Sequence, residues 1–316
     1  MTESTQGQSL GTAKLTVNDR EAEFPVLAAA DGNSAIDLST LTKQTGLTAL
    51  DYGFVNTAST KSSITYIDGD EGVLRYRGYP IEELAAKSTF LEVAYLLIHG
   101  EMPTADQLAA FEGEIRRHTL LHEDMRYYFE AVPHTAHPMA MLSGGLQTMS
   151  TYYESSLDTA VPEFVEVNTI RLLAKLPVLA AYAHKKSIGQ AFLYPKNDLG
   201  FVENFLRLNF GNKAEKYEIN PVLVDALDKL LILHADHEQN ASTSTVRLVG
   251  STGANMFSSV SAGINALSGP LHGGANEAVL DMLAQIRDSG QSVQAFVEKV
   301  KNKEDGVKLM GFGHRV

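Results

Sequence analysis

The chain changes character once, near Pro80, and this change limits the folds that it can adopt. Before that point, short β-like runs stand around turn residues: "KLTV" and "EFPV" flank "NDREA", and "DGDEG" interrupts the stretch that ends at Pro80. Such runs predict two β-hairpins. After Pro80 most segments carry apolar residues at helical spacing, which predicts helices. We therefore expect a mainly helical fold with a small β region at the front.

Helix boundaries can also be predicted from capping residues. Thr104 and Asn220 each precede a helical pattern and are good N-caps. The segment "IEELAAKSTFLEVAYLLIHG" predicts two short helices, with Ser88 or Thr89 as the cap between them. Pro177 lies inside a helical pattern and predicts a kink or a break there.

Composition excludes several classes of function. The 316 residues are 44% apolar and 20% charged, which is typical of a soluble globular protein of roughly two domains. A net charge of −12 without a basic stripe argues against nucleic acid as a partner. There is no cysteine, so disulfides and thiolate chemistry are excluded. No apolar run is long enough to span a membrane, the first residues lack a signal peptide, and a cytoplasmic location is expected.

The stretch "GPLHGGANEAVLDMLAQI" places His272 among glycines and a proline. Apolar residues at helical spacing follow it, with Asn276 as the expected N-cap and Glu277 at the positive end of the helix dipole. His272 is therefore expected in a tight turn just before a helix, where glycines let a ligand approach the backbone. The alternative is a glycine-rich loop whose histidine has no role.

A second histidine segment reads "LLILHADHEQNASTSTVR". His234 shares a face with leucines and is expected to pack in or near the core. His234, Asp236, His237 and Glu238 could form a metal cluster, but their spacing is not that of HExxH, and no metal is expected. We favour His237 and Asn240 as hydrogen-bond donors to a small polar anion.

The third segment is "LMGFGHRV" at the end of the sequence. Gly311 and Gly313 flank Phe312 and precede His314 and Arg315. Two glycines in three residues allow an irregular backbone that could contact a ligand. The alternative is a helix C-cap followed by a loop.

Other basic residues carry weaker signals. His118 and His122 are four residues apart beside two arginines, which favours a solvated face over a metal site. Arg171 and Lys175 form a second pair at the same spacing, expected to face solvent or an acidic group.

The three histidine segments occur together and in an order that resembles citrate synthase, as do "ITYIDGDEGVLRYRGYPI" and "HPMAML". The resemblance runs from about residue 12 to the last residue and is to the bacterial form with an N-terminal β region. It implies a two-domain, mainly helical fold and a homodimer or a dimer-based oligomer. The implied function is an acyltransferase that condenses acetyl-CoA with oxaloacetate and water to citrate and CoA, at the entry to the tricarboxylic acid cycle.

The resemblance also implies roles for individual residues. His272 matches the histidine that hydrogen-bonds the thioester carbonyl of acetyl-CoA, and His314 matches the one that protonates the oxaloacetate ketone. His237 matches an oxaloacetate-binding histidine, and Asn240 and Arg315 are assigned to substrate binding with it. The backbone of a glycine-containing loop resembles the part that receives CoA: Met310, Gly311, Phe312 and Gly313. Neither a metal nor a further cofactor is expected.

The expected organisation follows from this resemblance. Residues 1–11 are a disordered tail, 12–80 the β region, 81–274 the large helical domain and 275–316 the start of a small domain. The family's catalytic aspartate and its carboxylate-binding arginines match positions beyond residue 316. We therefore expect a truncated chain that has no activity by itself.

Some bacterial members of the family bind NADH as an allosteric inhibitor near residues that match Arg117, His118, Arg171 and Lys175. The alternative is that these are solvated surface charges.

Three other functions remain open. Methylcitrate synthases, which use propionyl-CoA, usually resemble "AEHEFNAST", so Asp236 and Gln239 favour acetyl-CoA here. A non-catalytic acyl-CoA or carboxylate-binding fragment is the second alternative. A metal hydrolase built on "HADHE" is the third.

Overall fold

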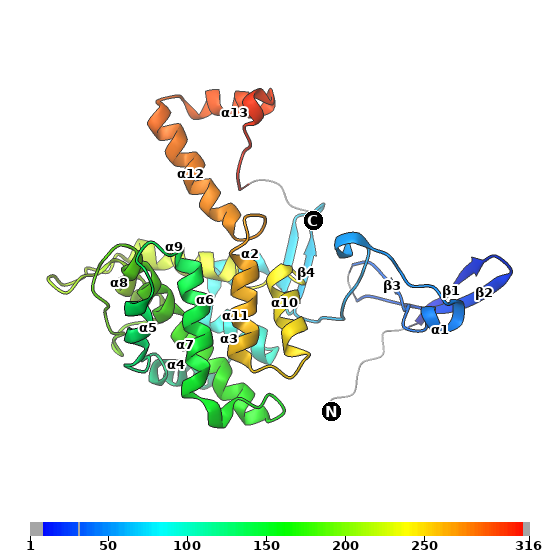
Figure 1. The fold of residues 1–316 in the computed structure, drawn as a ribbon, viewed down its shortest axis with the longest axis horizontal. Helices are drawn as coiled ribbons and strands as arrows, with labels where there is room; N and C mark the ends of the chain where they lie inside the picture. The colour runs from blue at the N-terminus through cyan, green and yellow to red at the C-terminus, as the bar shows by residue number, and fades with distance from the viewer. Residues whose placement is uncertain (1–8, 31, 312–316) are drawn as a thin grey trace. The chain divides into compact units, whose positions relative to one another are not determined.

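The computed structural model describes residues 9–30 and 32–311, which divide into two compact units with the sequence boundary between Ile81 and Glu82. The first unit contains two antiparallel sheets, in the strand orders β1-β2-β3 and β4-β5-β6 (Figure 1). The bounds are β1 (Ser9–Val17), β2 (Arg20–Leu27), β3 (Ala35–Ile36), β4 (Thr65–Asp68), β5 (Val73–Tyr76) and β6 (Tyr79–Pro80). A short helix, α1 (Leu41–Thr45), follows β3.

Both expected hairpins are confirmed. Val17 pairs with Arg20 across the first turn, and Asp68 pairs with Val73 across the second. The first hairpin is longer than expected because β1 begins at Ser9, which pairs with Leu27. The last three residues of the expected disordered tail therefore belong to a strand.

The second unit is helical. Its helices are α2 (Ile81–Lys87), α3 (Phe90–His99), α4 (Ala105–Arg117), α5 (Met125–Ala131), α6 (Pro138–Met149), α7 (Pro162–Ser187), α8 (Phe201–Phe210), α9 (Pro221–Leu233), α10 (Ala241–Gly250), α11 (Met256–Leu267), α12 (Gly274–Ser289) and α13 (Val293–Lys301). The domain boundary expected at residue 275 falls inside this unit, at the start of α12.

The capping residues set helix starts as expected. Thr104 and Thr89 each form a capping box with the residue three positions later, and the Asn220 side chain accepts the Val222 N–H. Pro177 lies inside α7, and the helix continues through it without a break. The neighbours of α7 stabilise this long helix by packing on it.

The core of the second unit lies where α6, α7 and α11 pack together (Figure 1). Met149, Leu179 and Phe257 are fully buried there. Ser143 of α6 and Ser261 of α11 hydrogen-bond to one another, with their hydroxyl oxygens 3.0 Å apart. Small side chains at this contact bring the two helices close, and α11 then positions the candidate site.

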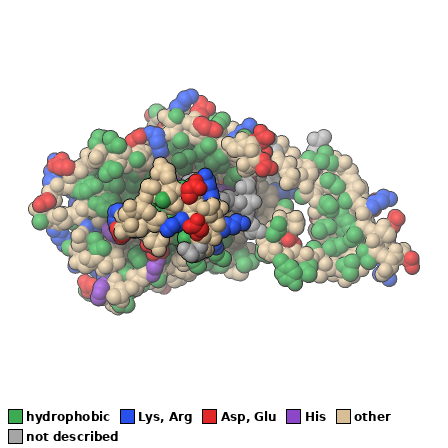
Figure 2. Space-filling model, turned by 90° about the horizontal axis from the view of Figure 1, so that it is seen from above, with side chains coloured by type: hydrophobic (Ala, Val, Ile, Leu, Met, Phe, Trp, Pro, Cys, Tyr) green, Lys and Arg blue, Asp and Glu red, His purple; other side chains and the backbone are tan. Residues whose placement is uncertain are grey.

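Apolar side chains also reach the surface (Figure 2). One of them, Leu271, is fully exposed directly beside His272. Among the described residues, no helix combines the length and apolar character needed to cross a membrane.

Candidate active site

His272 lies in the tight turn between α11 and α12, as the glycine pattern predicts. Its backbone N–H donates to the Gly269 carbonyl at 3.0 Å. The expected cap is wrong: α12 begins at Gly274, so Asn276 lies in its first turn. The turn itself starts the helix, because the Gly274 N–H also donates to the Gly269 carbonyl.

The glycines of this turn are required by the chain's own packing. A Cβ on Gly273 would lie 2.6 Å from the Leu267 carbonyl oxygen and 2.6 Å from Leu267 Cδ1. A Cβ on Gly274 would lie 3.0 Å from the Gly269 carbonyl oxygen. The backbone folds back on the end of α11 only because these positions lack side chains.

Ser242 of α10 holds the His272 ring. Its Oγ lies 2.9 Å from His272 Nε2 and 3.0 Å from the Gly263 carbonyl oxygen of α11. A Cβ on Gly263 would lie 2.6 Å from Val246 Cγ2, so α10 and α11 pack closely at this point. The two segments that sequence analysis singled out, "HADHEQNASTS" and "GPLHGG", therefore meet at Ser242 and His272.

The contact with Ser242 allows two arrangements of the protons between the hydroxyl and the His272 ring. The serine has one hydroxyl proton, which it can donate to the Gly263 carbonyl or to Nε2. If Nε2 accepts it, the neutral ring carries its own proton on Nδ1 and presents an N–H donor. The N-terminus of α12 directly follows His272.

The His237 segment is a strained loop between α9 and α10. Glu238 has φ of 53°, in the left-handed region that non-glycine residues rarely adopt. Asp236 stabilises this bend, because its carboxylate accepts the Glu238 N–H at 2.9 Å. Gln239 accepts a hydrogen bond from Arg247 Nη1 at 2.8 Å. Both residues that separate this chain from the methylcitrate pattern thus fix the loop that carries His237, whose side chain is exposed.

Asn240 is the N-cap of α10. Its Oδ1 accepts the Thr243 N–H at 2.9 Å, and its amide NH₂ can donate to a ligand. The expectation that His234 packs in the core is wrong. It is exposed at the end of α9, where Leu230 and Leu233 are exposed as well.

Part of the third segment is described. The Met310 N–H donates to the Met282 sulfur at 3.3 Å, which ties the segment to α12. Gly311 has φ of 83°, and a Cβ on it would lie 2.8 Å from Val279 Cγ2. Phe312, Gly313, His314 and Arg315 lie outside the described residues.

Comparisons with known proteins decide the family. A family model described as "Citrate synthase, C-terminal domain" matches residues 53–316. The chain is 62% identical to citrate synthase 1 of Mycobacterium tuberculosis over 305 residues, which is 96% of this chain and 71% of that protein. The chain belongs to the citrate synthase family. Its function is that of a citrate synthase, a transferase-type enzyme.

Solved citrate synthases share the fold. The structure from Pyrobaculum aerophilum is 33% identical, with a TM-score of 0.75 over 99% of this chain and 71% of that one. A ternary complex of carboxymethyl coenzyme A and oxaloacetate with the Thermoplasma acidophilum citrate synthase is 28% identical. It has a TM-score of 0.74 over 85% of this chain and 68% of that one. The mainly helical fold expected from the sequence is confirmed.

The residues of "HADHE" do not gather into a metal site. Within residues 9–30 and 32–311, no group of three or more His, Asp or Glu side chains is arranged to hold an ion. His234 turns its Nδ1 to the Leu230 carbonyl at 2.8 Å, back along its own helix. This arrangement does not favour the metal hydrolase alternative.

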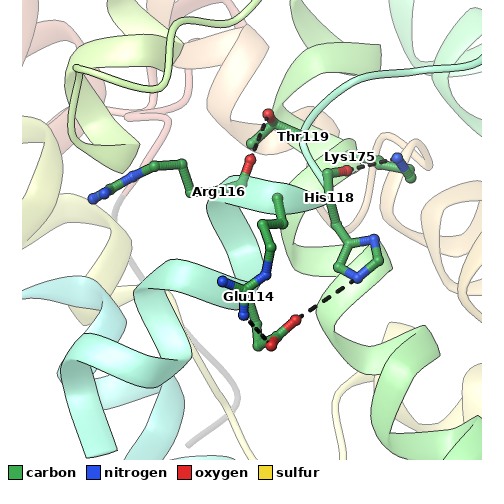
Figure 3. A network of polar contacts seen from close by, with 6 residues as sticks. Glu114, Arg116, His118, Thr119 and Lys175 are labelled. Carbon is green, nitrogen blue, oxygen red and sulfur yellow. Dashed lines mark hydrogen bonds and ion pairs between the residues drawn. The ribbon is translucent and has the colours of Figure 1, made fainter. Parts of the chain in front are cut away.

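The basic residues that the family resemblance links to NADH lie where the end of α4 meets α7 (Figure 3). The expectation that Lys175 is solvated is wrong: it is 3% exposed, and its amine donates to the His118 carbonyl at 2.6 Å and to the Leu120 carbonyl. Arg171 is half-buried, and its guanidinium lies 4.2 Å above the Tyr153 ring. Neither cation has an acidic partner among the residues that the structure describes.

The other two residues of this group face an acid. The Arg117 guanidinium pairs with Glu114, and His118 Nε2 lies 3.9 Å from the same carboxylate (Figure 3). Burial lowers the pKa of His118, and the charges of Lys175 and Arg171 lower it further. Burial also lowers the pKa of Lys175 to about 8, with a smaller contribution from Arg171. Positive charge is therefore unfavourable here unless an anion binds.

Sequence reasoning missed Ser242. It lies in the quoted segment "NASTSTVR", among hydroxyl residues that look alike in the sequence. Only the packing of α10 on α11 distinguishes it, because this packing turns Ser242 to His272 while Thr245 bonds back to Ala241 of its own helix.

Proposed function

We propose that the protein condenses acetyl-CoA with oxaloacetate and water to give citrate and CoA, with His272 at the thioester carbonyl. The observation that carries this proposal is the 2.9 Å contact between Ser242 Oγ and His272 Nε2. It holds one imidazole at a helix N-terminus, next to the helix that follows His237 and Asn240.

The chemistry follows from where charge develops. When a base of the full-length protein takes a proton from the methyl group of acetyl-CoA, negative charge grows on the thioester oxygen. A donor held at that oxygen contributes about 10²- to 10³-fold in rate. When the Ser242 hydroxyl donates to Nε2 and not to the Gly263 carbonyl, His272 supplies this donor from Nδ1–H. The enol then forms next to a hydrogen-bond donor, without a full proton transfer from His272.

The enol carbon then attacks the oxaloacetate ketone, and water hydrolyses the resulting thioester to release CoA. We assign His237 and the Asn240 NH₂ to oxaloacetate, and His314 to the proton that the new hydroxyl receives. Arg315 joins the substrate group, and Met310, Gly311, Phe312 and Gly313 receive CoA. A small domain that starts near residue 275 would place His272 at a cleft that can close to exclude water.

The test is thiol release by the full-length protein. We expect acetyl-CoA with oxaloacetate to release free CoA, and His272→Ala to reduce kcat by about 10²-fold or more. Exposed His134→Ala is the matched control and should leave kcat unchanged. Propionyl-CoA with a higher kcat/KM than acetyl-CoA would instead support methylcitrate synthase. Ligand binding with no release from either thioester would support a non-catalytic module.

We also propose that the protein forms a homo-oligomer.

A second proposal is a regulatory site for NADH, formed by Arg117, His118, Arg171 and Lys175. Two cations without acidic partners beside the Tyr153 ring support the second proposal, because a dinucleotide supplies phosphates and stacking rings. NADH should inhibit the full-length enzyme, and Arg171→Gln should weaken this by about tenfold or more. Arg287→Gln, on exposed α12, is the control. Absence of inhibition by NADH overturns the proposal.

A further inference from the structure

A pocket opens in the second unit between α3, α4, α7 and α8, and none of its residues belongs to the candidate active site. Its empty volume is about 560 Å³, which includes the open solvent at its mouth. The floor is made of buried apolar side chains: Leu91, Ile115, Ala174, Val178 and Leu208. An occupant must therefore carry an apolar part.

One wall of the pocket is held in place by hydrogen bonds. The loop before α8 lines it with Pro195 and Leu199. The Asn204 side chain accepts the Lys196 N–H at 2.8 Å and donates to the Lys196 carbonyl at 2.6 Å. A loop fixed in this way loses little conformational freedom when a ligand binds.

Two opposite charges also line the pocket, one turn apart on α4. Glu112 and Arg116 both belong to the lining, and no side-chain hydrogen bond or ion pair is found for either one within the described ranges. Their neighbours on the helix, Glu114 and Arg117, pair with each other. Figure 3 shows the Arg116 side chain extending away from that network, with its guanidinium making none of the marked contacts.

We propose that this pocket binds a free α-amino acid with an aliphatic side chain, such as leucine. The carboxylate pairs with Arg116, the ammonium group pairs with Glu112, and the side chain covers the apolar floor. A simple carboxylate would meet the Glu112 charge, and a simple amine would meet Arg116. An uncharged ligand would leave both charges without a partner. Only a zwitterion with an apolar part complements the whole lining.

Three matched ligands test the charge requirement by calorimetry or ligand-observed NMR on the full-length protein. L-Leucine, 4-methylpentanoate and isopentylamine share one branched chain and differ only in their charged groups. Leucine should bind saturably with a Kd of about 1 mM or below, and the other two at least about tenfold more weakly. The proposal is overturned if leucine shows no saturation by about 10 mM, or if either analogue binds equally well.

Variants of the two charged residues test the assignment. Glu112→Gln and Arg116→Gln should each weaken leucine binding by about tenfold or more. Arg117→Gln is the matched control: it removes a neighbouring arginine that pairs with Glu114 outside the pocket, and leucine binding should not change. Unchanged binding in either pocket variant overturns the assignment. Because the readout is binding, a failure here leaves the proposed condensation reaction untouched, and the reverse also holds.

Discussion

The Ser242 hydroxyl lies between the Gly263 carbonyl and His272, and this places one residue of α10 in control of the candidate catalytic ring. Removing the hydroxyl leaves Nε2 without its partner and the ring free to turn. A misplacement of about 1 Å costs about 10²-fold in rate when a donor must meet a developing charge. The contact therefore predicts a kinetic effect for a residue that touches no substrate in the proposed mechanism.

We expect Ser242→Ala to lower kcat by about 10- to 100-fold while the fold is kept. The KM for oxaloacetate should change less, because His237 and Asn240 remain in place. Ser251→Ala is the control, since within residues 9–30 and 32–311 that hydroxyl bonds only to the Leu248 carbonyl of α10. A variant that keeps the wild-type kcat would show that the serine does not position the ring.

The turn at His272 predicts a contrast between two glycines. Gly273→Ala places a methyl group 2.6 Å from the Leu267 carbonyl oxygen, so the turn must shift. We expect a loss of about 1–3 kcal/mol in the free energy of unfolding, together with lower activity. Denaturant unfolding followed by circular dichroism measures the first effect, and thiol release measures the second.

Gly113→Ala is the matched substitution. Gly113 lies inside α4, and among the described residues its Cβ would meet only the Arg117 Nη1, at 3.7 Å. Because alanine favours helices more than glycine does, this variant should gain about 0.5–1 kcal/mol and keep its activity. Equal stabilities of the two variants would contradict the crowding described for the turn.

Local sequence patterns predicted the helical fold, both hairpins and the caps at Thr104 and Asn220, because these depend on neighbouring residues. They failed where distant contacts decide. The helical spacing of the leucines predicted that His234 is buried in the core. Leu230 on the same face is nevertheless 51% exposed. The two basic residues of α7, four apart, looked solvated, but the carbonyls at the end of α4 surround the Lys175 amine.

The candidate site shows the same division. The sequence singled out His272 and its turn, because glycines and an apolar helix follow it directly. It gave no reason to choose Ser242 among the hydroxyls of α10, since the partner lies 30 residues away. A motif therefore marks which residue acts, and the packing of α10 on α11 determines which residue orients it.

Lys175 predicts a pH dependence of stability. Its pKa is about 8 in the folded chain and near 10.5 when exposed, mainly because it is buried. Between these values the unfolded chain binds more protons, so this residue's contribution to the free energy of unfolding rises with pH. From pH 8 to pH 9.5 the gain should be about 1–2 kcal/mol.

Denaturant unfolding of wild type and Lys175→Met at both pH values measures this gain as the difference between the two proteins. Lys87→Met, whose exposed amine pairs with Glu83, should follow wild type. Parallel curves for wild type and Lys175→Met would mean that the buried amine keeps its ordinary pKa.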